Sequence, residues 1–158
     1  MALDHFISPT VPEAPAMAVR LGAGSGTSNQ VDTKEQGKIV KLAGESRYDL
    51  AVAGDDIEAI IYAVELAPQN GFSIGSVYSE GRARVVFDGL QATPGTGVVA
   101  VGDYVVAGSV TAKGTALTSY PKVCKATSQG TQKRLWRVVS LGAVGTGAVG
   151  TVGVIARV

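Results

Sequence analysis

Residues 134–158 read RLWRVVSLGAVGTGAVGTVGVIARV, and this stretch decides the fold. Its centre, GTGAVG at 145–150, matches the G-x-G-x-x-G fingerprint of dinucleotide-binding domains letter for letter. That fingerprint needs a helix opening at its glycines to hold the pyrophosphate, and an acidic residue about 20 positions later to hold the ribose. The chain ends at Val158 with no acidic residue after Gly150, and residues 151–158 have the composition of a strand. The glycines therefore predict a turn between two strands, 135–141 and 151–158.

The rest of the chain has the same character. Glycine supplies 21 of 158 residues, while charged residues make up only 17%, which suits short strands joined by many turns. We predict an all-β fold: a single compact antiparallel β-barrel or sandwich with an extended, Pro/Gly-rich N-terminal arm. In addition to the terminal pair, strands are expected at 38–42, 48–53, 72–78, 82–87, 98–101, 104–107, 115–117 and 123–126.

Two of these strands flank the sequence Ser-Glu-Gly at 79–81, which predicts a hairpin between 72–78 and 82–87. In the second of them, alternation places Arg82 and Arg84 on one face.

Residues 57–66 are ambiguous. Their isoleucines and valine, at 57, 60, 61 and 64, have the spacing of one face of a helix. The alternative is a turn at 54–56 followed by a strand over 58–66. We favour the strand, because the segment is short and its neighbours are strands.

The first 36 residues differ from the rest and are predicted to form the arm, with one domain over 37–158. Pro9, Pro12 and Pro15 oppose helix, and a Gly/Ser-rich stretch follows at 22–29. The segment is either a partly ordered terminus or an arm that docks on a neighbouring subunit. We favour docking, because the segment carries apolar residues that an idle tail would not need: Phe6, Ile7, Val11, Met17, Val19 and Leu21.

The sequence gives little support for a catalytic function. The single histidine, His5, lies in the arm, and one histidine with one cysteine cannot build a zinc site. Cys124 is predicted to be a small buried hydrophobe on a strand. The acidic cluster Asp55, Asp56 and Glu58 lacks the calcium-loop frame and predicts a solvated turn, with a weak cation site as the alternative. We therefore expect no enzyme activity, no cofactor and no metal.

The balance of charges gives no direct indication of a partner. The formal net charge is +1, and the longest apolar run, 59–64, is far shorter than a membrane span. The N-terminus lacks the features of a signal peptide.

One cluster of basic residues with aromatic residues between them could bind single-stranded nucleic acid. We favour instead protection of a sheet edge or a contact between subunits, with Trp136 and Arg137 as candidate anchors. The members of this cluster are Tyr120, Lys122, Lys125, Lys133, Arg134, Trp136 and Arg137.

The pattern of residues 37–158 resembles the capsid decoration proteins of tailed bacteriophages, also called cement or head-stabilising proteins, and several stretches carry this resemblance. The most persuasive is GDYVVAG at 102–108. The others are SRYDLAVAGD (46–55), GFSIGSV (71–77) with EGR (80–82), WRVVSL (136–141) and the glycine-rich terminal hairpin.

This resemblance implies a structural virion protein, made in the bacterial host cytoplasm, that binds the outside of a capsid shell and stabilises it across capsomer junctions. The implied partners are the major capsid protein and further copies of the chain, most simply as a trimer, with no membrane and no direct nucleic acid contact. The family has no catalytic residues to carry over. The alternatives are another non-enzymatic virion component, from the tail, the baseplate or the head, or an unrelated binding domain.

Overall fold

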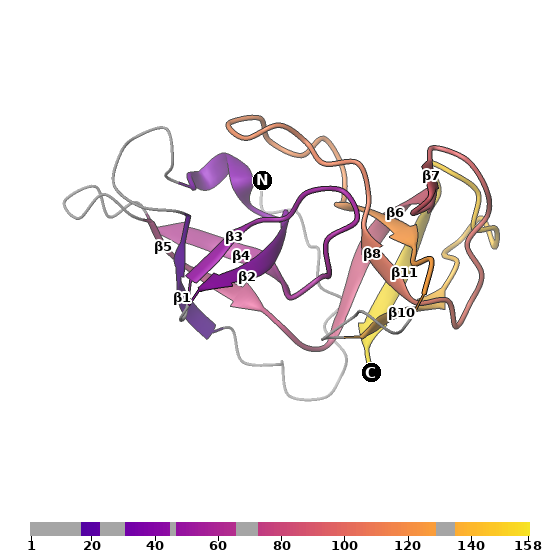
Figure 1. The fold of residues 1–158 in the computed structure, drawn as a ribbon, viewed down its shortest axis with the longest axis horizontal. Coiled ribbons are helices and arrows are strands. Elements are labelled where there is room, and N and C mark those ends of the chain that lie inside the picture. Colours follow the sequence, from indigo (N-terminus) through magenta and orange to yellow (C-terminus); the bar gives the residue numbers. More distant parts are fainter. Residues whose placement is uncertain (1–16, 23–30, 45–46, 66–72, 129–134) are drawn as a thin grey trace.

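The computed structural model describes residues 17–22, 31–44, 47–65, 73–128 and 135–158. Within them the chain is all-β, as predicted, with one short 3₁₀ helix, η1 (Thr33–Glu35). The strands form two lobes that follow each other along the sequence (Figure 1). The first lobe, the N-terminal barrel, is closed in the order β1-β3-β2-β4-β5. Its strands are β1 (Met17–Leu21), β2 (Ile39–Gly44), β3 (Arg47–Leu50), β4 (Ala59–Glu65) and β5 (Ser73–Tyr78).

The second lobe, the C-terminal sheet, has the order β10-β11-β6-β9-β8, and β7 pairs with β6 beside this path. Its strands are β6 (Arg82–Leu90), β7 (Thr93–Pro94), β8 (Val105–Ala107), β9 (Lys122–Lys125), β10 (Trp136–Ser140) and β11 (Val152–Arg157). Most pairs are antiparallel, but β1 pairs with β3 and β6 with β9 in parallel. The predicted terminal pair is confirmed, because β10 and β11 are antiparallel neighbours.

The two outer strands of the C-terminal sheet come together through residues 102–104. Tyr104 forms an isolated antiparallel bridge with Arg137. The Val138 N–H donates to the Asp103 carbonyl at 2.9 Å, and the Gly102 N–H donates to the Val138 carbonyl at 2.8 Å. Backbone groups on this side of β10 are therefore already used, which leaves little free edge for another strand to join.

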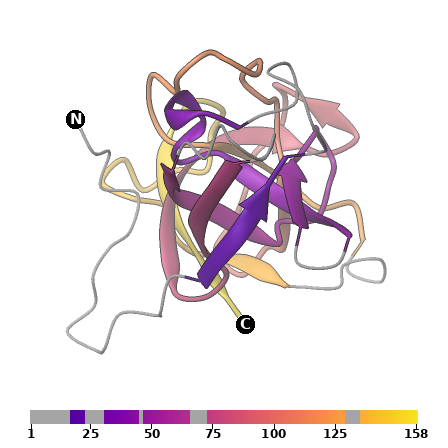
Figure 2. The same ribbon diagram turned by 90° about the vertical axis from the view of Figure 1, so that its left-hand side faces the viewer.

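The barrel lobe, which faces the viewer in Figure 2, encloses a small core of its own. The buried side chains of this core come from all of the barrel strands and from the segment before η1. They are Leu21, Val31, Val40, Tyr48, Ala59, Ile61, Val64 and Val77.

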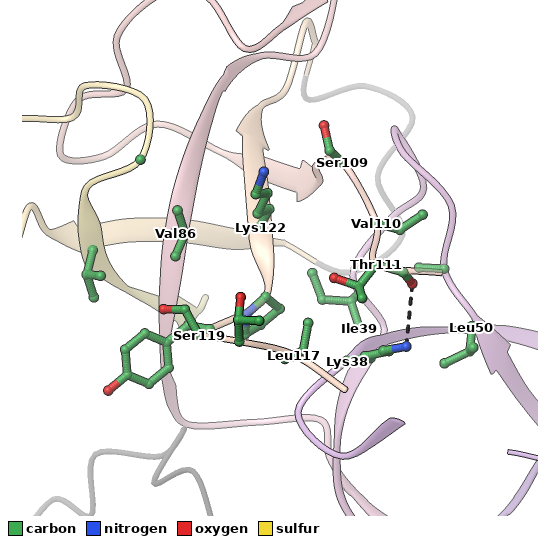
Figure 3. Close-up of a pocket in the computed structure, with 16 residues that line it drawn as sticks. Lys38, Ile39, Leu50, Val86, Ser109, Val110, Thr111, Leu117, Ser119 and Lys122 are labelled. Atoms are coloured by element: carbon green, nitrogen blue, oxygen red, sulfur yellow. Dashed lines mark hydrogen bonds between the residues drawn. The ribbon is translucent and has the colours of Figure 1, made fainter. Parts of the chain in front are cut away.

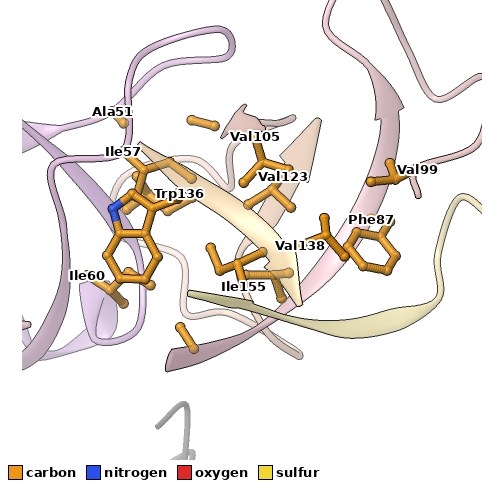
Figure 4. Packing of buried hydrophobic residues seen from close by; sticks show 14 residues of the cluster. Ala51, Ile57, Ile60, Phe87, Val99, Val105, Val123, Trp136, Val138 and Ile155 are labelled. Carbon is orange, nitrogen blue, oxygen red and sulfur yellow. The ribbon is translucent and has the colours of Figure 1, made fainter. Parts of the chain in front are cut away.

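A second buried cluster joins the two lobes (Figure 4). The barrel contributes Ile39, Ala51, Ile57 and Ile60 from its outer side. The C-terminal sheet contributes its inner face, with Trp136 standing against Ile57 and Ile60. Because this shared cluster contains the largest buried side chain of the described residues, the lobes form one packed unit.

The ambiguous segment 57–66 is a strand, as favoured. Its helix-like spacing arises because β4 is buried on both sides: Ile60 belongs to the shared cluster, whereas Ile61 points into the barrel core. A register shift between Ile61 and Ala63 then brings Val64 back to the barrel core.

The predicted hairpin between 72–78 and 82–87 is wrong. β5 is already paired on both edges, with β1 and β4, so β6 has no edge of β5 to join. The linker 79–81 instead carries the chain from one lobe to the other. Arg157 holds it in place: its guanidinium donates to the Ser79 carbonyl at 2.6 Å, and its backbone N–H donates to the Gly81 carbonyl at 3.2 Å.

Two other predicted strands are not strands: residues 115–117, and residues 98–101, which contribute only an isolated bridge at Val98. The predicted boundary of the arm is also wrong. β1, which pairs with both β3 and β5, and η1 lie within the range 1–36, so these segments belong to the barrel lobe. Residues 1–16 lie outside the described residues.

Candidate interaction surface

The outer face of the C-terminal sheet presents three arginines, which we call the arginine face: Arg82, Arg84 and Arg137. Alternation along β6 buries Ala83, Val85 and Phe87 and leaves Arg82 and Arg84 exposed, as predicted. Residues directly opposite on neighbouring strands share a face of a sheet. Arg82 and Arg137 both lie opposite Ala156, from either side, and Arg84 lies opposite Val154. Since neighbouring strands are about 4.8 Å apart, Arg82 and Arg137 stand roughly 10 Å apart across Ala156.

The carboxylates of the C-terminal half form ion pairs with lysines and with Arg157. Residues 79–158 contain three acidic residues, Glu80, Asp88 and Asp103. Each has another cation: Asp88 has Lys122 at 3.9 Å, Asp103 has Lys125 at 3.0 Å, and Glu80 has Arg157 at 3.7 Å. The three printed ion pairs of these carboxylates thus use cations outside the arginine face.

The net charge of +1 is the result of two opposite halves. Residues 1–78 contain five basic and ten acidic residues, a formal charge of −5. Residues 79–158 contain nine basic and three acidic residues, a formal charge of +6. The near-neutral total thus conceals two halves of the chain with large, opposite net charges.

A pocket of about 240 Å³ lies where the barrel meets the C-terminal sheet, beneath the loop 108–121 (Figure 3). Ile39 and Leu50 line it from the barrel, and Val86 and Val152 from the sheet. Leu117 and several hydroxyl-bearing residues of the loop complete the wall. This junction pocket has the size and apolar lining to receive one large side chain of a partner.

A buried ion pair fixes the loop over this pocket. Glu35 is fully buried and lies 3.5 Å from the Nζ of Lys38, which is 6% exposed. Lys38 also donates to the Ala112 carbonyl at 2.9 Å, and Glu35 accepts from the Gly114 N–H. At the other end of the loop, Asp88 accepts from the Ser109 N–H at 2.7 Å. The pocket roof is therefore fastened to both lobes.

Glu35 also takes part in the cap of η1. Its carboxylate accepts from the Asp32 N–H at 2.9 Å, while the Asp32 carboxylate accepts from the Lys34 N–H at 2.7 Å. Hydrogen bonding involving Glu35, followed by that from Lys34 and the nearby lysine charges, lowers the pKa of Asp32 below its ordinary value. The local structure thus holds both carboxylates in place.

An exposed apolar patch, which we call the valine tip, occupies the far end of the C-terminal sheet. It consists of Val98, Val101, Val144 and Val149, which are 41–65% exposed. The two loops that carry it, 95–103 and 141–151, lie side by side at the right of Figure 1. A bridge between Val98 and Ala148 joins them, and the Val99 N–H donates to the Gly147 carbonyl at 2.9 Å.

The false nucleotide fingerprint is thus one half of the valine tip. A side chain at Gly147 would place its Cβ 1.6 Å from the Val99 carbonyl oxygen, so only glycine fits this close approach between the loops. A second hollow, of about 570 Å³, runs from the tip at Val144 to Arg84 on the arginine face. The two surfaces are therefore neighbours.

The described residues offer no reactive group at these surfaces. Cys124 is buried on β9, as predicted. Burial, followed by the charge of Asp88, raises the pKa of its thiol to about 11, so it stays protonated at neutral pH. Within the described ranges, no three His, Cys, Asp or Glu residues gather to hold a metal ion.

The acidic cluster at 55–58 is a turn only in part. Asp55 accepts from the Val52 N–H at 2.8 Å and pairs with Lys41 at 2.7 Å. Glu58, which was expected to be solvated, is 8% exposed, because it directly precedes the buried strand β4.

The predicted contact residues fall into three groups. Phe6, Ile7 and Val11 lie outside the described residues. Met17 is exposed, Val19 is half-buried and Arg137 is exposed on the arginine face. Leu21 and Trp136 have no accessible surface, so neither can touch a partner in this fold, because both serve as core residues.

Arg82 and Arg84, which alternation places on one face, are not among the predicted contact residues. The basic excess of residues 79–158 becomes visible when charge is counted separately for the two halves of the chain, because the total of +1 hides it. The valine tip carried no comparable signal, since its valines become neighbours only through folding.

No protein-family model, curated protein or solved structure matches this chain. Among the described residues, no helix is long and apolar enough to span a membrane.

Proposed function

We propose that this chain is a structural virion protein that binds the outside of a bacteriophage capsid shell and stabilises it across the junctions between capsomers. The sequence resemblance to capsid decoration proteins suggests the partner. The observation that carries the proposal is the valine tip, because an exposed apolar patch on two hydrogen-bonded loops is typical of a surface that another protein covers.

The proposed mechanism needs no reaction. A protein that binds the assembled shell and not its separated subunits stabilises the shell by mass action. Each tip buries its four valines against the shell, and burial of a valine contributes roughly 1.5 kcal/mol or more. Because the two loops are already hydrogen-bonded to each other, little further ordering is needed on binding.

The test uses shells assembled from the major capsid protein encoded in the same genome. Wild-type protein should co-sediment with expanded shells and raise the temperature at which they fall apart. The double variant Val98→Asp/Val144→Asp should lose both effects, because two carboxylates would have to be buried at the contact.

The matched control is Val52→Asp, which changes a valine in the barrel lobe that is 55% exposed, against 64% and 65% for the two tip valines, and should bind like wild type. Circular dichroism melts establish that the variants remain folded. Wild-type protein that neither binds nor protects shells would refute the function. A tip variant that binds as tightly as wild type would refute the role of the valine tip.

A further inference from the structure

We infer that the junction pocket binds an uncharged small molecule of roughly ten non-hydrogen atoms, with an apolar body and one oxygen-bearing head such as a hydroxyl or carbonyl group. The inference goes beyond the proposed function, because it concerns a different site and a small molecule instead of a capsid shell. The binding can be measured on the purified protein alone.

The walls of the pocket select an apolar body. Val86 and Val152 lie opposite each other on neighbouring strands, so their side chains share the outer face of the C-terminal sheet. The volume of about 240 Å³ exceeds that of an apolar cavity of roughly 150 Å³ that holds one benzene molecule, and in proportion it admits roughly ten non-hydrogen atoms. The apolar side chains of the lining come from the barrel, the sheet and the loop above them (Figure 3): Ile39, Leu50, Val86, Val152 and Leu117.

The polar groups of the lining select the head of the ligand. Hydroxyl-bearing residues of the loop line the pocket together with Lys38 and Lys122, and no carboxylate side chain of the described residues does. Hydroxyl and ammonium groups donate hydrogen bonds, so the complementary head is one that accepts them, such as an alcohol or carbonyl oxygen. The hydroxyl-bearing residues are Ser109, Thr111, Thr118, Ser119 and Tyr120.

The ion pairs beside the pocket indicate that the ligand is uncharged. Lys38 pairs with Glu35 at 3.5 Å, and Lys122 pairs with Asp88 at 3.9 Å. Both carboxylates are buried, so each lysine of the lining already has an anionic partner within the protein. A charged head would have to give up its water without a counter-ion of its own, and a cationic head would also lie beside two lysines.

The roof of the pocket favours a free molecule over a side chain carried by a partner. The loop 108–121 is fastened to the barrel by the hydrogen bond from Lys38 to the Ala112 carbonyl, and to the sheet by that from the Ser109 N–H to Asp88. The backbone of a partner would have to approach past this covered side, whereas a small molecule needs only to pass the rim. An apolar recess with a few polar groups, placed where two lobes meet, is typical of a small-molecule site.

The experiment is isothermal titration calorimetry of the full chain with 1-octanol, a molecule of the required size. We expect a one-to-one complex with a Kd of about 0.5 mM or lower. Octylammonium has the same alkyl body and a cationic head, so it should bind about tenfold or more weakly. Octanol at a few times its Kd should also raise the melting temperature by about 2 °C or more, since it binds the folded protein.

Two variants that fill the pocket locate the site. Leu117→Trp adds volume from the loop and Val152→Phe adds volume from the sheet, so each should weaken octanol binding about tenfold or more. Thr115→Trp is the matched control, because it adds the same side chain at an exposed position of the same loop that does not line the pocket. It should bind octanol like wild type. Melting curves establish that each variant is folded, and Val152→Phe carries the test if Leu117→Trp is not.

Three results would overturn the inference. Calorimetry could show no saturable one-to-one binding, octylammonium could bind as tightly as octanol, or both filled variants could bind octanol like wild type. The filled variants keep the valine tip, so they should still co-sediment with shells. A protein that binds shells but not octanol would refute this inference alone, whereas one that binds octanol and ignores shells would refute the proposed function alone.

Discussion

The barrel and the C-terminal sheet are both β-structures of similar length, but they use their surfaces differently. The barrel half has an excess of acidic residues, and three of its carboxylates pair with cations of the same lobe. The sheet half has an excess of basic residues, exposes three arginines on one face and ends in an apolar tip. The difference teaches that formal charge must be counted for each lobe separately, because the whole-chain value of +1 describes neither lobe.

The lobes also differ in what they need from each other. The barrel has a closed core of its own, whereas the inner face of the sheet is covered by Ile57 and Ile60 from the outside of the barrel. We therefore expect the two lobes to unfold in one cooperative transition, and the predictions below test that expectation.

The largest effect is expected at Trp136, which fills the space between the lobes. Trp136→Ala should lower the free energy of unfolding by about 3–5 kcal/mol, because it opens a large cavity in the shared cluster. Urea titrations followed by circular dichroism measure the loss. A second, separate transition in this variant would show that the barrel can stay folded without the sheet.

Trp136→Phe is the matched control. The buried indole N–H has no hydrogen-bond partner among the described residues. Phenylalanine keeps most of the volume and removes this unsatisfied donor, so its cost should be less than half that of alanine. Equal losses for the two variants would contradict the packing explanation.

The next largest effect is expected at Lys38, which links the barrel to the loop over the junction pocket. Lys38→Met should cost about 3 kcal/mol, because it leaves the buried Glu35 without its cation and the Ala112 carbonyl without its donor. Lys41→Met, three residues further along the chain on β2, removes a surface pair with Asp55 and should cost no more than about 1 kcal/mol. Similar losses for the two variants, measured by urea titration, would mean that the buried pair does not fasten the loop.

Much of the C-terminal sheet could be predicted from the sequence because its signals are local. The alternation in β6 and the glycine turn before β11 both lie within short stretches. The barrel was harder to predict from the sequence. β4 is buried on both faces, so Ile60 and Ile61 imitate a helix, and the pairing of β1 with β5 joins residues far apart in the chain.

The candidate surfaces were predictable only in part, for the same physical reason. The exposure of Arg82 and Arg84 follows from alternation, but the cation with which each carboxylate of the C-terminal half pairs depends on the fold. Trp136 was proposed as a surface anchor because tryptophan is common at interfaces, yet the barrel covers it. No sequence pattern indicates which lobe will cover an aromatic residue.

A smaller effect, confined to the sheet lobe, is expected at the glycines of the tip. Gly147→Ala should cost about 2 kcal/mol, because its Cβ would overlap the Val99 carbonyl and push the two loops apart. Gly150→Ala has open space around it and should cost only about 1 kcal/mol, for its positive φ of 85°. Thermal melts and shell co-sedimentation measure both variants. If Gly147→Ala binds shells as tightly as wild type, binding by the tip valines does not depend on the close approach of the two loops.

The smallest effect is expected from the pH dependence of Cys124, the only thiol of the chain, which reports on the sheet lobe alone. Its pKa is raised to about 11 in the folded protein from an ordinary value of 9.0, so the folded state keeps the proton longer than the unfolded state. The resulting stability is complete below pH 9 and is lost as the pH rises from about 9 toward 11. At pH about 10 the loss in the free energy of unfolding should be about 1 kcal/mol, and Cys124→Ala should not show this dependence on pH.

Chemical labelling of the thiol at pH about 8 should require opening of the sheet lobe. If labelling is as slow as global unfolding, the two lobes open together; if it is much faster, the sheet opens while the barrel stays closed.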